Sequence, residues 1–250
     1  MRERQDEWSA KDRQRIAAEG LTVEEADRQL ALFRQGVSPV SLNRPCRAGD
    51  GIVLLTPAEQ EELVAAYEQS LRTKEIMKFV PASGAASRMF KSWYKGLREG
   101  GFATEVERNS FFHDLERYPF FSDLKATVAP KGIDLDDLLR KRAEGAILRH
   151  ILTEEGLNYG QLPKALLKFH TYPMGGRTAL EEHLVEAALY ARDSRGCARL
   201  HLTVSIEHEQ GIRDRLLQVT AEYEALCGAI IEIGVSRQEK ATNTLAVDPE

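Results

Sequence analysis

The stretch from residue 178 to residue 235 constrains the fold of this 250-residue chain more than any other part of the sequence. Residues 178–191 and 208–226 are predicted as helices, and residues 200–206 and 229–235 as strands. The apolar positions of the first strand are expected to share one face: Leu200, Leu202, Val204 and Ile206. Because parallel strands need a crossover connection, usually a helix, this order predicts an α/β fold with a mixed or mostly parallel sheet flanked by helices.

A further strand, predicted at residues 75–80, leads into a turn of small residues and then into a helix opened by Arg88. The turn residues are Ala82, Ser83, Gly84, Ala85, Ala86 and Ser87. Small side chains let a ligand approach the backbone, and Gly84 can take a positive φ angle. Free N–H groups at the start of the helix favour an anion, and Arg88 in its first turn adds a fixed charge for phosphate oxygens. This turn, at the carboxyl ends of the strands, is therefore a candidate ligand site.

The same turn has a second interpretation. Its small residues can simply allow the helix to pack closely against the sheet, because a single glycine is a weak signal for a phosphate-binding loop. The turn has neither the Lys-Ser/Thr ending of a Walker A motif nor the three glycines of a dinucleotide-binding turn. The residues alone give the two interpretations equal weight.

A second candidate is Lys164, which follows Pro163 and precedes an apolar run. A lysine at the edge of a core can project into a site as a point charge. Taken alone, however, Lys164 is better explained as an exposed lysine in a loop than as a lysine in a binding site.

The chain is predicted to have two regions. Residues 1–72 form a helical N-terminal region, in which capping boxes at Thr22 and Thr56 begin two helices. Residues 73–250 form the α/β core, with a helical insertion at about 92–158. The apolar positions expected in the core of that insertion are Phe111, Leu115, Leu124, Leu138, Leu139, Ile147 and Leu148.

Composition excludes several classes of protein. The formal net charge of −5 gives no basic excess for tracking along nucleic acid. The three cysteines are far apart, which favours reduced thiols in a cytoplasmic protein over a disulfide framework. No apolar stretch approaches the ~20 residues of a membrane span. Oligomeric state has no signal in the sequence.

Together, the two motifs resemble those of the nucleotidyltransferases that make nucleotide sugars. Those proteins carry Ala-Gly-Gly-x-Gly-Thr-Arg-Leu/Met after their first strand and Pro-Lys-x-Leu further on. Residues 82–89 and 163–166 are similar to these patterns. From its N-terminal helices to Asp248, the chain is similar to the first half of a bacterial domain-of-unknown-function family (4301), related to sugar-1-phosphate nucleotidyltransferases and UDP-sugar pyrophosphorylases. The segment at Ser236 to Gln238 resembles the one that carries a Phe-x-Gln element in the pyrophosphorylases.

The resemblance implies transfer of a nucleotidyl group from a nucleoside triphosphate to a phosphorylated sugar or similar acceptor, with release of pyrophosphate. It implies catalytic roles for Arg88 and Lys164, which would neutralise phosphate charge. The nucleotide-binding residues that it implies are Ala82, Ser83, Gly84, Ala85, Ala86, Ser87, Lys91 and Gln238. It also implies Mg²⁺ as a cofactor, with no protein ligand identified in this sequence.

The chain departs from the superfamily pattern in three ways, and two of them, the glycine replacements and the early end, motivate an alternative function. Ser83 and Ala86 replace two of its glycines, and the insertion at 92–158 separates the two motifs widely. The chain also ends at Glu250, before the usual positions of the metal-binding aspartate and the base-recognition loop, so the core is expected to be incomplete. The alternative is a non-catalytic nucleotide-sensing or protein-interaction module on the same fold.

Overall fold

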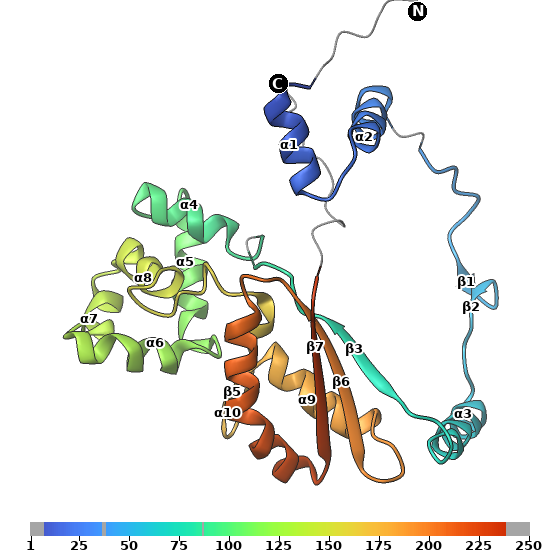
Figure 1. Ribbon diagram of the computed structural model, residues 1–250. Coiled ribbons are helices and arrows are strands. Elements are labelled where there is room, and N and C mark those ends of the chain that lie inside the picture. The colour runs from blue at the N-terminus through green and yellow to red at the C-terminus, as the bar shows by residue number, and fades with distance from the viewer. Residues whose placement is uncertain (1–7, 37–38, 87, 239–250) are drawn as a thin grey trace, which may run out of the picture. The chain divides into compact units, whose positions relative to one another are not determined.

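The computed structural model describes residues 8–36, 39–86 and 88–238, which are drawn as ribbons in Figure 1. The chain divides into two compact units, one of residues 1–65 with 239–250 and one of residues 66–238. The boundary lies a few residues before the one expected at residue 72. Within the described residues, no helix combines the length and the apolar character that a membrane crossing requires.

The first unit contains two helices that pack together, α1 (Ala10–Ala18) and α2 (Val23–Gln35). The predicted helix start at Thr22 is confirmed, because its hydroxyl accepts a hydrogen bond from the Glu25 N–H at 3.1 Å. A pair of two-residue strands follows, β1 (Arg47–Ala48) and β2 (Gly51–Ile52).

Helix α3 (Pro57–Ser70) crosses the boundary between the two units. The capping box predicted at Thr56 is confirmed, with both of its bonds present. The Glu59 N–H donates to the Thr56 hydroxyl at 3.3 Å, and the Glu59 carboxylate accepts from the Thr56 N–H at 2.8 Å. These reciprocal bonds satisfy backbone donors that a helix start otherwise leaves without partners.

The second unit is built on a three-stranded parallel sheet of β3 (Met77–Pro81), β6 (Cys197–Val204) and β7 (Ile230–Arg237). The strand order is β3–β6–β7, and Leu200 of β6 pairs with Lys78 on one side and Ile233 on the other. The mixed α/β fold with a parallel sheet is therefore confirmed.

One face of this sheet packs against two helices, α9 (Ala179–Tyr190) and α10 (Glu209–Cys227). Both helices contribute to a single apolar cluster with the strands, and the largest of its fully buried side chains are Leu180, Leu184, Leu200, Leu202 and Ile212. Leu200, Leu202 and Val204 are buried, as predicted, but Ile206 is 55% exposed. The prediction for Ile206 is wrong because β6 ends at Val204, so the alternation no longer holds two residues later.

The opposite face of the sheet carries Phe79, which is 60% exposed and stacks on His201 at a ring-centroid distance of 5.7 Å. His201 lies in register between Phe79 and Gly234. A Cβ atom at position 234 would lie 2.7 Å from the His201 Nδ1 atom, so glycine there makes room for the imidazole.

The stretch predicted as a helical insertion at about 92–158 holds a series of short helices: α4 (Lys91–Glu99), α5 (Glu105–Asp114), η1 (Leu115–Arg117), α6 (Phe121–Val128), η2 (Ala129–Lys131), α7 (Leu135–Arg140) and α8 (Glu144–Leu152). They have an apolar core of their own that includes Phe111, Leu115, Leu124, Ile147 and Leu148. Leu138 and Leu139 are partly buried against it. The helices form one group in Figure 1, labelled α4 to α8.

A short helical turn and a hairpin connect this insertion to α9. They are η3 (Lys164–Leu166) and the antiparallel strands β4 (Lys168–Tyr172) and β5 (Gly175–Thr178). The sequence interpretation did not foresee the hairpin. Thr178 both ends β5 and caps α9, through a capping box with the buried Glu181.

A buried carboxylate organises the approach to the amino end of β6. Asp193 is 7% exposed and accepts hydrogen bonds from the Cys197 N–H at 3.1 Å and from Arg199 at 3.0 Å. Burial alone would raise its pKa, but the hydrogen bonds from Cys197, Arg199 and Arg195 outweigh burial and hold the pKa of Asp193 well below its ordinary value.

The packing of the central strand predicts the cost of removing one of its side chains. Leu202 is fully buried, so Leu202→Ala should lower the free energy of unfolding by about 2–5 kcal/mol, through lost burial and the cavity left behind. Leu217, on α10, is 83% exposed, and Leu217→Ala should change it by less than about 0.5 kcal/mol. Urea unfolding of both variants measures the contrast, and equal losses would contradict this assignment of the core.

Asp193 predicts a dependence of stability on pH. Because its pKa is lower in the folded state than in the unfolded state, its charge stabilises the fold at neutral pH. That contribution falls as the pH drops below the unfolded pKa of about 3.9 and toward the depressed folded pKa. Asp193→Asn should therefore be less stable than the wild type at pH 7, with a smaller difference at pH 3. Urea unfolding at both pH values tests this, and a difference that stays constant would refute it.

Candidate functional site

The carboxyl ends of the three parallel strands meet at one edge of the sheet. Pro81, Thr203 and Ser236 lie in register there, so the segments that follow the strands emerge side by side. The Ala82 N–H donates to the Thr203 carbonyl at 2.7 Å, and the Gln238 N–H donates to the Val204 carbonyl at 2.8 Å. Backbone pairing thus extends one residue past β3 and β7 and fixes where the turn after β3 begins.

The turn of small residues has a buried and an exposed part. Ala82 and Ala86 are buried, whereas Gly84 and Ala85 are exposed. The Ser83 hydroxyl is hydrogen-bonded to the side chain of Gln238, so two of the candidate nucleotide-binding residues are in contact. Ser87 lies outside the described residues.

Gly84 does not use the conformational freedom that its residue type allows. It is absent from the glycines with a positive φ, and a Cβ atom built on it would meet no atom within 4 Å. Its small size therefore leaves open space beside the backbone instead of relieving strain. Within the described residues, the N–H groups of Ser83, Gly84 and Ala85 have no hydrogen-bond acceptor.

The sequence predicted Arg88 in the first turn of the helix. In the structure Arg88 lies in a separate turn that precedes the helix. Helix α4 begins at Lys91, and the Met89 N–H closes the preceding turn by donating to the Ala86 carbonyl at 2.9 Å. The chain bends here because Phe90 is buried against the aromatic core of the insertion, with its ring 5.3 Å from that of Trp93. Both Arg88 and Lys91 are exposed.

Lys164 is bound directly to the small-residue turn through its backbone. Its N–H donates to the Gly84 carbonyl at 2.9 Å, and Pro163 forms an antiparallel bridge with Ala85. Pro163 and Ala165 are buried on either side of it, while Lys164 itself is exposed. The structure therefore brings together the two motifs that the sequence separates by the whole insertion.

Arg88 and Lys164 are the two cationic side chains of these motifs. Among the described residues, neither Arg88 nor Lys164 forms an ion pair with a carboxylate. By contrast, Arg237 at the end of β7 is paired with Glu209. Arg237 and Arg213 together lower the pKa of the Glu209 carboxyl.

A histidine that the sequence analysis did not select holds the same edge together. His208 Nε2 lies 3.1 Å from the Gln161 carbonyl, and His208 Nδ1 lies 2.8 Å from the Ser205 hydroxyl. A carbonyl only accepts hydrogen bonds, so Nε2 carries a proton and donates to Gln161, and in the neutral tautomer Nδ1 accepts from the Ser205 hydroxyl. The sequence signal that could have identified His208 is its place in the polar segment directly after a buried strand.

The described residues at this edge do not fit a magnesium site. Glu209 at the start of α10 is already paired with Arg213 and Arg237, and Glu207 in the segment after β6 is not free either. Nowhere in residues 8–36, 39–86 and 88–238 do three or more His, Cys, Asp or Glu side chains gather as metal ligands. The segment from 242 to 248, which the resemblance covers, lies outside these ranges.

The chain is thus an α/β protein with a parallel sheet. The small-residue turn, Arg88 and Lys164 lie in the segments at the carboxyl ends of its strands. The chain belongs to a family described as a domain of unknown function, DUF4301, whose family model matches residues 9–250. Neither a curated protein nor a solved structure matches the chain.

Proposed function

We propose that the carboxyl edge of the sheet binds a nucleoside triphosphate and transfers its nucleotidyl group to a phosphorylated sugar or similar acceptor. The observation that carries the proposal is the hydrogen bond from the Lys164 N–H to the Gly84 carbonyl, which joins the two motifs of the resemblance at this edge. In open α/β sheets, ligands bind outside the carboxyl ends of the strands.

Each part of the edge has a role in this proposal. The N–H groups of Ser83, Gly84 and Ala85 would donate to phosphate oxygens, since an exposed turn with free donors is suited to an anion. Arg88 and Lys164 would neutralise the charge of the triphosphate and of the departing pyrophosphate. Gln238 and Lys91 would line the same site.

The reaction is a displacement at phosphorus. An oxygen of the acceptor phosphate forms a bond to the α-phosphorus, and the bond from that phosphorus to the oxygen bridging the α- and β-phosphates breaks. Pyrophosphate leaves with the electron pair of the broken bond. Such a transfer depends mainly on positioning and on stabilisation of charge, which is what the cations and backbone donors would supply.

A second candidate is nucleotide binding without chemistry. The pairing of Glu209 with Arg237 and Arg213 favours it, because a carboxylate held by two arginines is not available to bind a metal ion. Release of pyrophosphate separates the two candidates, because only the transferase forms it.

The first test is a thermal-shift panel with ATP, GTP, CTP, UTP and dTTP, each with and without Mg²⁺. A ligand that binds only the folded chain stabilises it by about 2.7 kcal/mol at a hundred times its dissociation constant. A shift with one of the nucleotides would support the proposal and identify the donor. No shift with any of them would refute nucleotide binding by this chain.

Removing either cation should weaken nucleotide binding. A hydrogen bond to a charged group contributes about 1.5–3 kcal/mol, so Arg88→Ala and Lys164→Ala should each reduce affinity by about tenfold or more. Lys95→Ala serves as the control, because Lys95 is an exposed lysine on α4 outside the edge. Titration calorimetry gives the affinities, and unchanged values for both edge variants would exclude these residues from the site.

Gly84→Ala tests whether a ligand approaches the backbone. The added methyl group meets open space and the φ angle suits alanine, so stability should be unchanged or higher by up to about 1 kcal/mol. If phosphates lie against this backbone, nucleotide affinity should still fall. A variant with wild-type stability and wild-type affinity would show that the turn serves only packing.

A further inference from the structure

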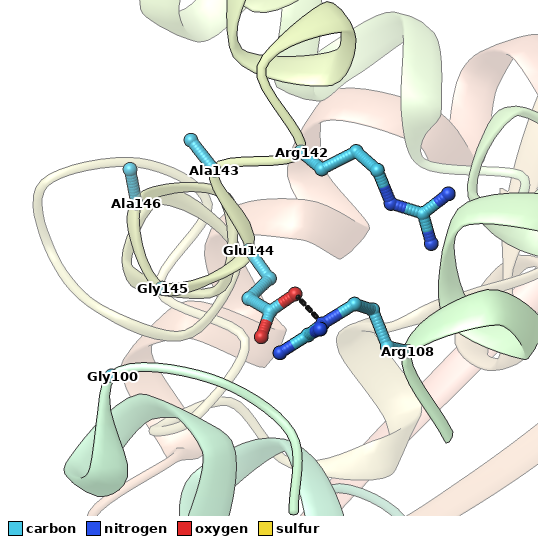
Figure 2. A pocket seen from close by; sticks show the side chains of 7 residues that line it. All are labelled: Gly100, Arg108, Arg142, Ala143, Glu144, Gly145 and Ala146. Carbon is cyan, nitrogen blue, oxygen red and sulfur yellow. Dashed lines mark hydrogen bonds and ion pairs between the residues drawn. The ribbon is translucent and has the colours of Figure 1, made fainter. Parts of the chain in front are cut away.

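Two hollows on the helical insertion differ in what their walls offer to a ligand. Figure 2 shows the first, in which the buried Glu144 carboxylate faces Arg108 and accepts a hydrogen bond from its Nε at 2.6 Å. Arg108 also pairs with the exposed Glu105 at 2.6 Å. The charged groups of this wall are already paired with one another, so the first hollow holds helices together and offers little to a ligand.

The second hollow, the aromatic pocket, has a volume of about 330 Å³ and a mostly apolar lining. Sites for small molecules typically have volumes of about 300–1,000 Å³ and are lined mainly by apolar and aromatic side chains, with a few polar groups. The aromatic pocket therefore has the size and the walls of a site for a flat organic ring. Its aromatic residues are Phe90, Trp93, Tyr118, Phe120, Tyr159 and Phe169.

The rings of the aromatic pocket hold one another in place. Tyr118 and Phe120 lie parallel with their ring centres 5.2 Å apart, and the Tyr159 ring meets Phe120 at 5.1 Å. Trp93 packs edge-on against Tyr118 at 5.6 Å. Because these rings belong to or pack against the core of the insertion, the walls are ordered before a ligand arrives, and binding costs little side-chain entropy.

The lining of the aromatic pocket is electrically neutral. Lys168 contributes a positive charge, and Asp123 balances it at 2.6 Å. Burial raises the pKa of Tyr159 to about 12, so its hydroxyl stays uncharged at neutral pH. The pocket therefore suits an uncharged ring and not an anion.

Two apolar side chains of the lining remain exposed to solvent. Met89 is 44% exposed, and Phe169, on β4, is 37% exposed. A ring bound in the pocket would remove part of their apolar surface from water, which favours binding. Because neither side chain is buried in the core, each can be shortened at a modest cost to the fold.

The aromatic pocket continues directly from the carboxyl edge of the sheet. Ala86 of the small-residue turn belongs to the same apolar cluster as Leu167 of the pocket. Arg88 immediately precedes Met89, and Lys164 lies three residues before Leu167. Two wall segments of the pocket are thus continuations of the segments that carry the two cations, so a ligand held by these cations has the pocket beside it.

We propose that the aromatic pocket binds the base of the nucleotide. The inference rests on the proposed function, which puts the phosphates at Arg88 and Lys164. A base is flat and uncharged at neutral pH, and it stacks on aromatic side chains whatever its sequence identity. The charged end of the nucleotide thus meets the cations and its neutral end the neutral pocket, which makes the helical insertion part of the substrate site.

The test compares nucleotides with a probe that lacks the base. Titration calorimetry of the full chain with ATP, UTP and tripolyphosphate, each with Mg²⁺, gives three affinities. Stacking of a base on aromatic residues contributes about fivefold to a hundredfold in affinity, so at least one nucleotide should bind more tightly than tripolyphosphate by that factor.

Two variants of the exposed lining residues locate the effect. M89A and F169A should weaken nucleotide binding by about fivefold or more and leave the affinity for tripolyphosphate unchanged, which also shows that the fold and the phosphate site are intact. M174A is the matched control, because Met174 is 83% exposed in the turn between β4 and β5 and does not line the pocket. Its affinities should equal those of the wild type.

Trp93 reports on the pocket directly. The chain has two tryptophans, and in W8F the remaining indole fluorescence comes from the wall of the pocket. A base stacked among these rings should quench that fluorescence, with the same affinity that calorimetry gives. Tripolyphosphate should leave it unchanged.

Several results would overturn the inference, and they are distinguishable from failure of the proposed function. If both nucleotides bind no more tightly than tripolyphosphate, or if M89A and F169A bind them as the wild type does, the base lies elsewhere and the phosphate site stands. An equal loss in M174A would show that the effect is not specific to the pocket. If none of the three probes binds, the proposed function is refuted and this inference falls with it.

Discussion

The second unit depends on the pairing of β6 with β3 on one side and β7 on the other. Because all three strands are parallel, every one of them ends at the same edge, and the segments that follow must share that edge. The alternation of β6 buries Leu200, Leu202 and Val204 against α9 and α10, which fixes the register. A slip of one residue would turn this apolar row to the opposite face and bury Arg199 and His201 in its place.

This register also explains why the two motifs meet. The small-residue turn leaves β3 at the carboxyl edge, and the segment around Lys164 returns from the insertion to the same place. The insertion has its own apolar core, so it can be long without disturbing the sheet from which it departs. His208 adds a second tie, since it joins the segment after β6 to the chain just before Lys164.

The insertion uses a buried charge in a way that differs from the sheet. Glu144 holds the loop after α4, the start of α8 and Arg108 of α5 together by accepting hydrogen bonds with both oxygens. A buried carboxylate is costly unless it is paired in this way, so its position fixes that of Arg108. Asp193 has a similar structural role at the amino end of β6, where it accepts hydrogen bonds from the Cys197 N–H and from Arg199.

The sequence alone determined the local features of this protein. The capped helix starts at Thr22 and Thr56, the strand of alternating residues from Leu200 to Val204 and the α/β order were all readable, because each depends on spacing between near neighbours. The resemblance predicted that the two motifs belong together, and the structure shows their backbones in contact. The start of α4 was misplaced because Phe90 is drawn into a core made by residues far along the chain.

Only the tertiary structure decided which side chains share a site. The hydrogen bond between Lys164 and Gly84, the contact of His208 with Gln161 and the ion pair of Arg108 with Glu144 all join segments whose separation in sequence carries no signal of contact. Such contacts are set by strand order and by the way separate helices fill one core. No periodicity within a single segment encodes either of these.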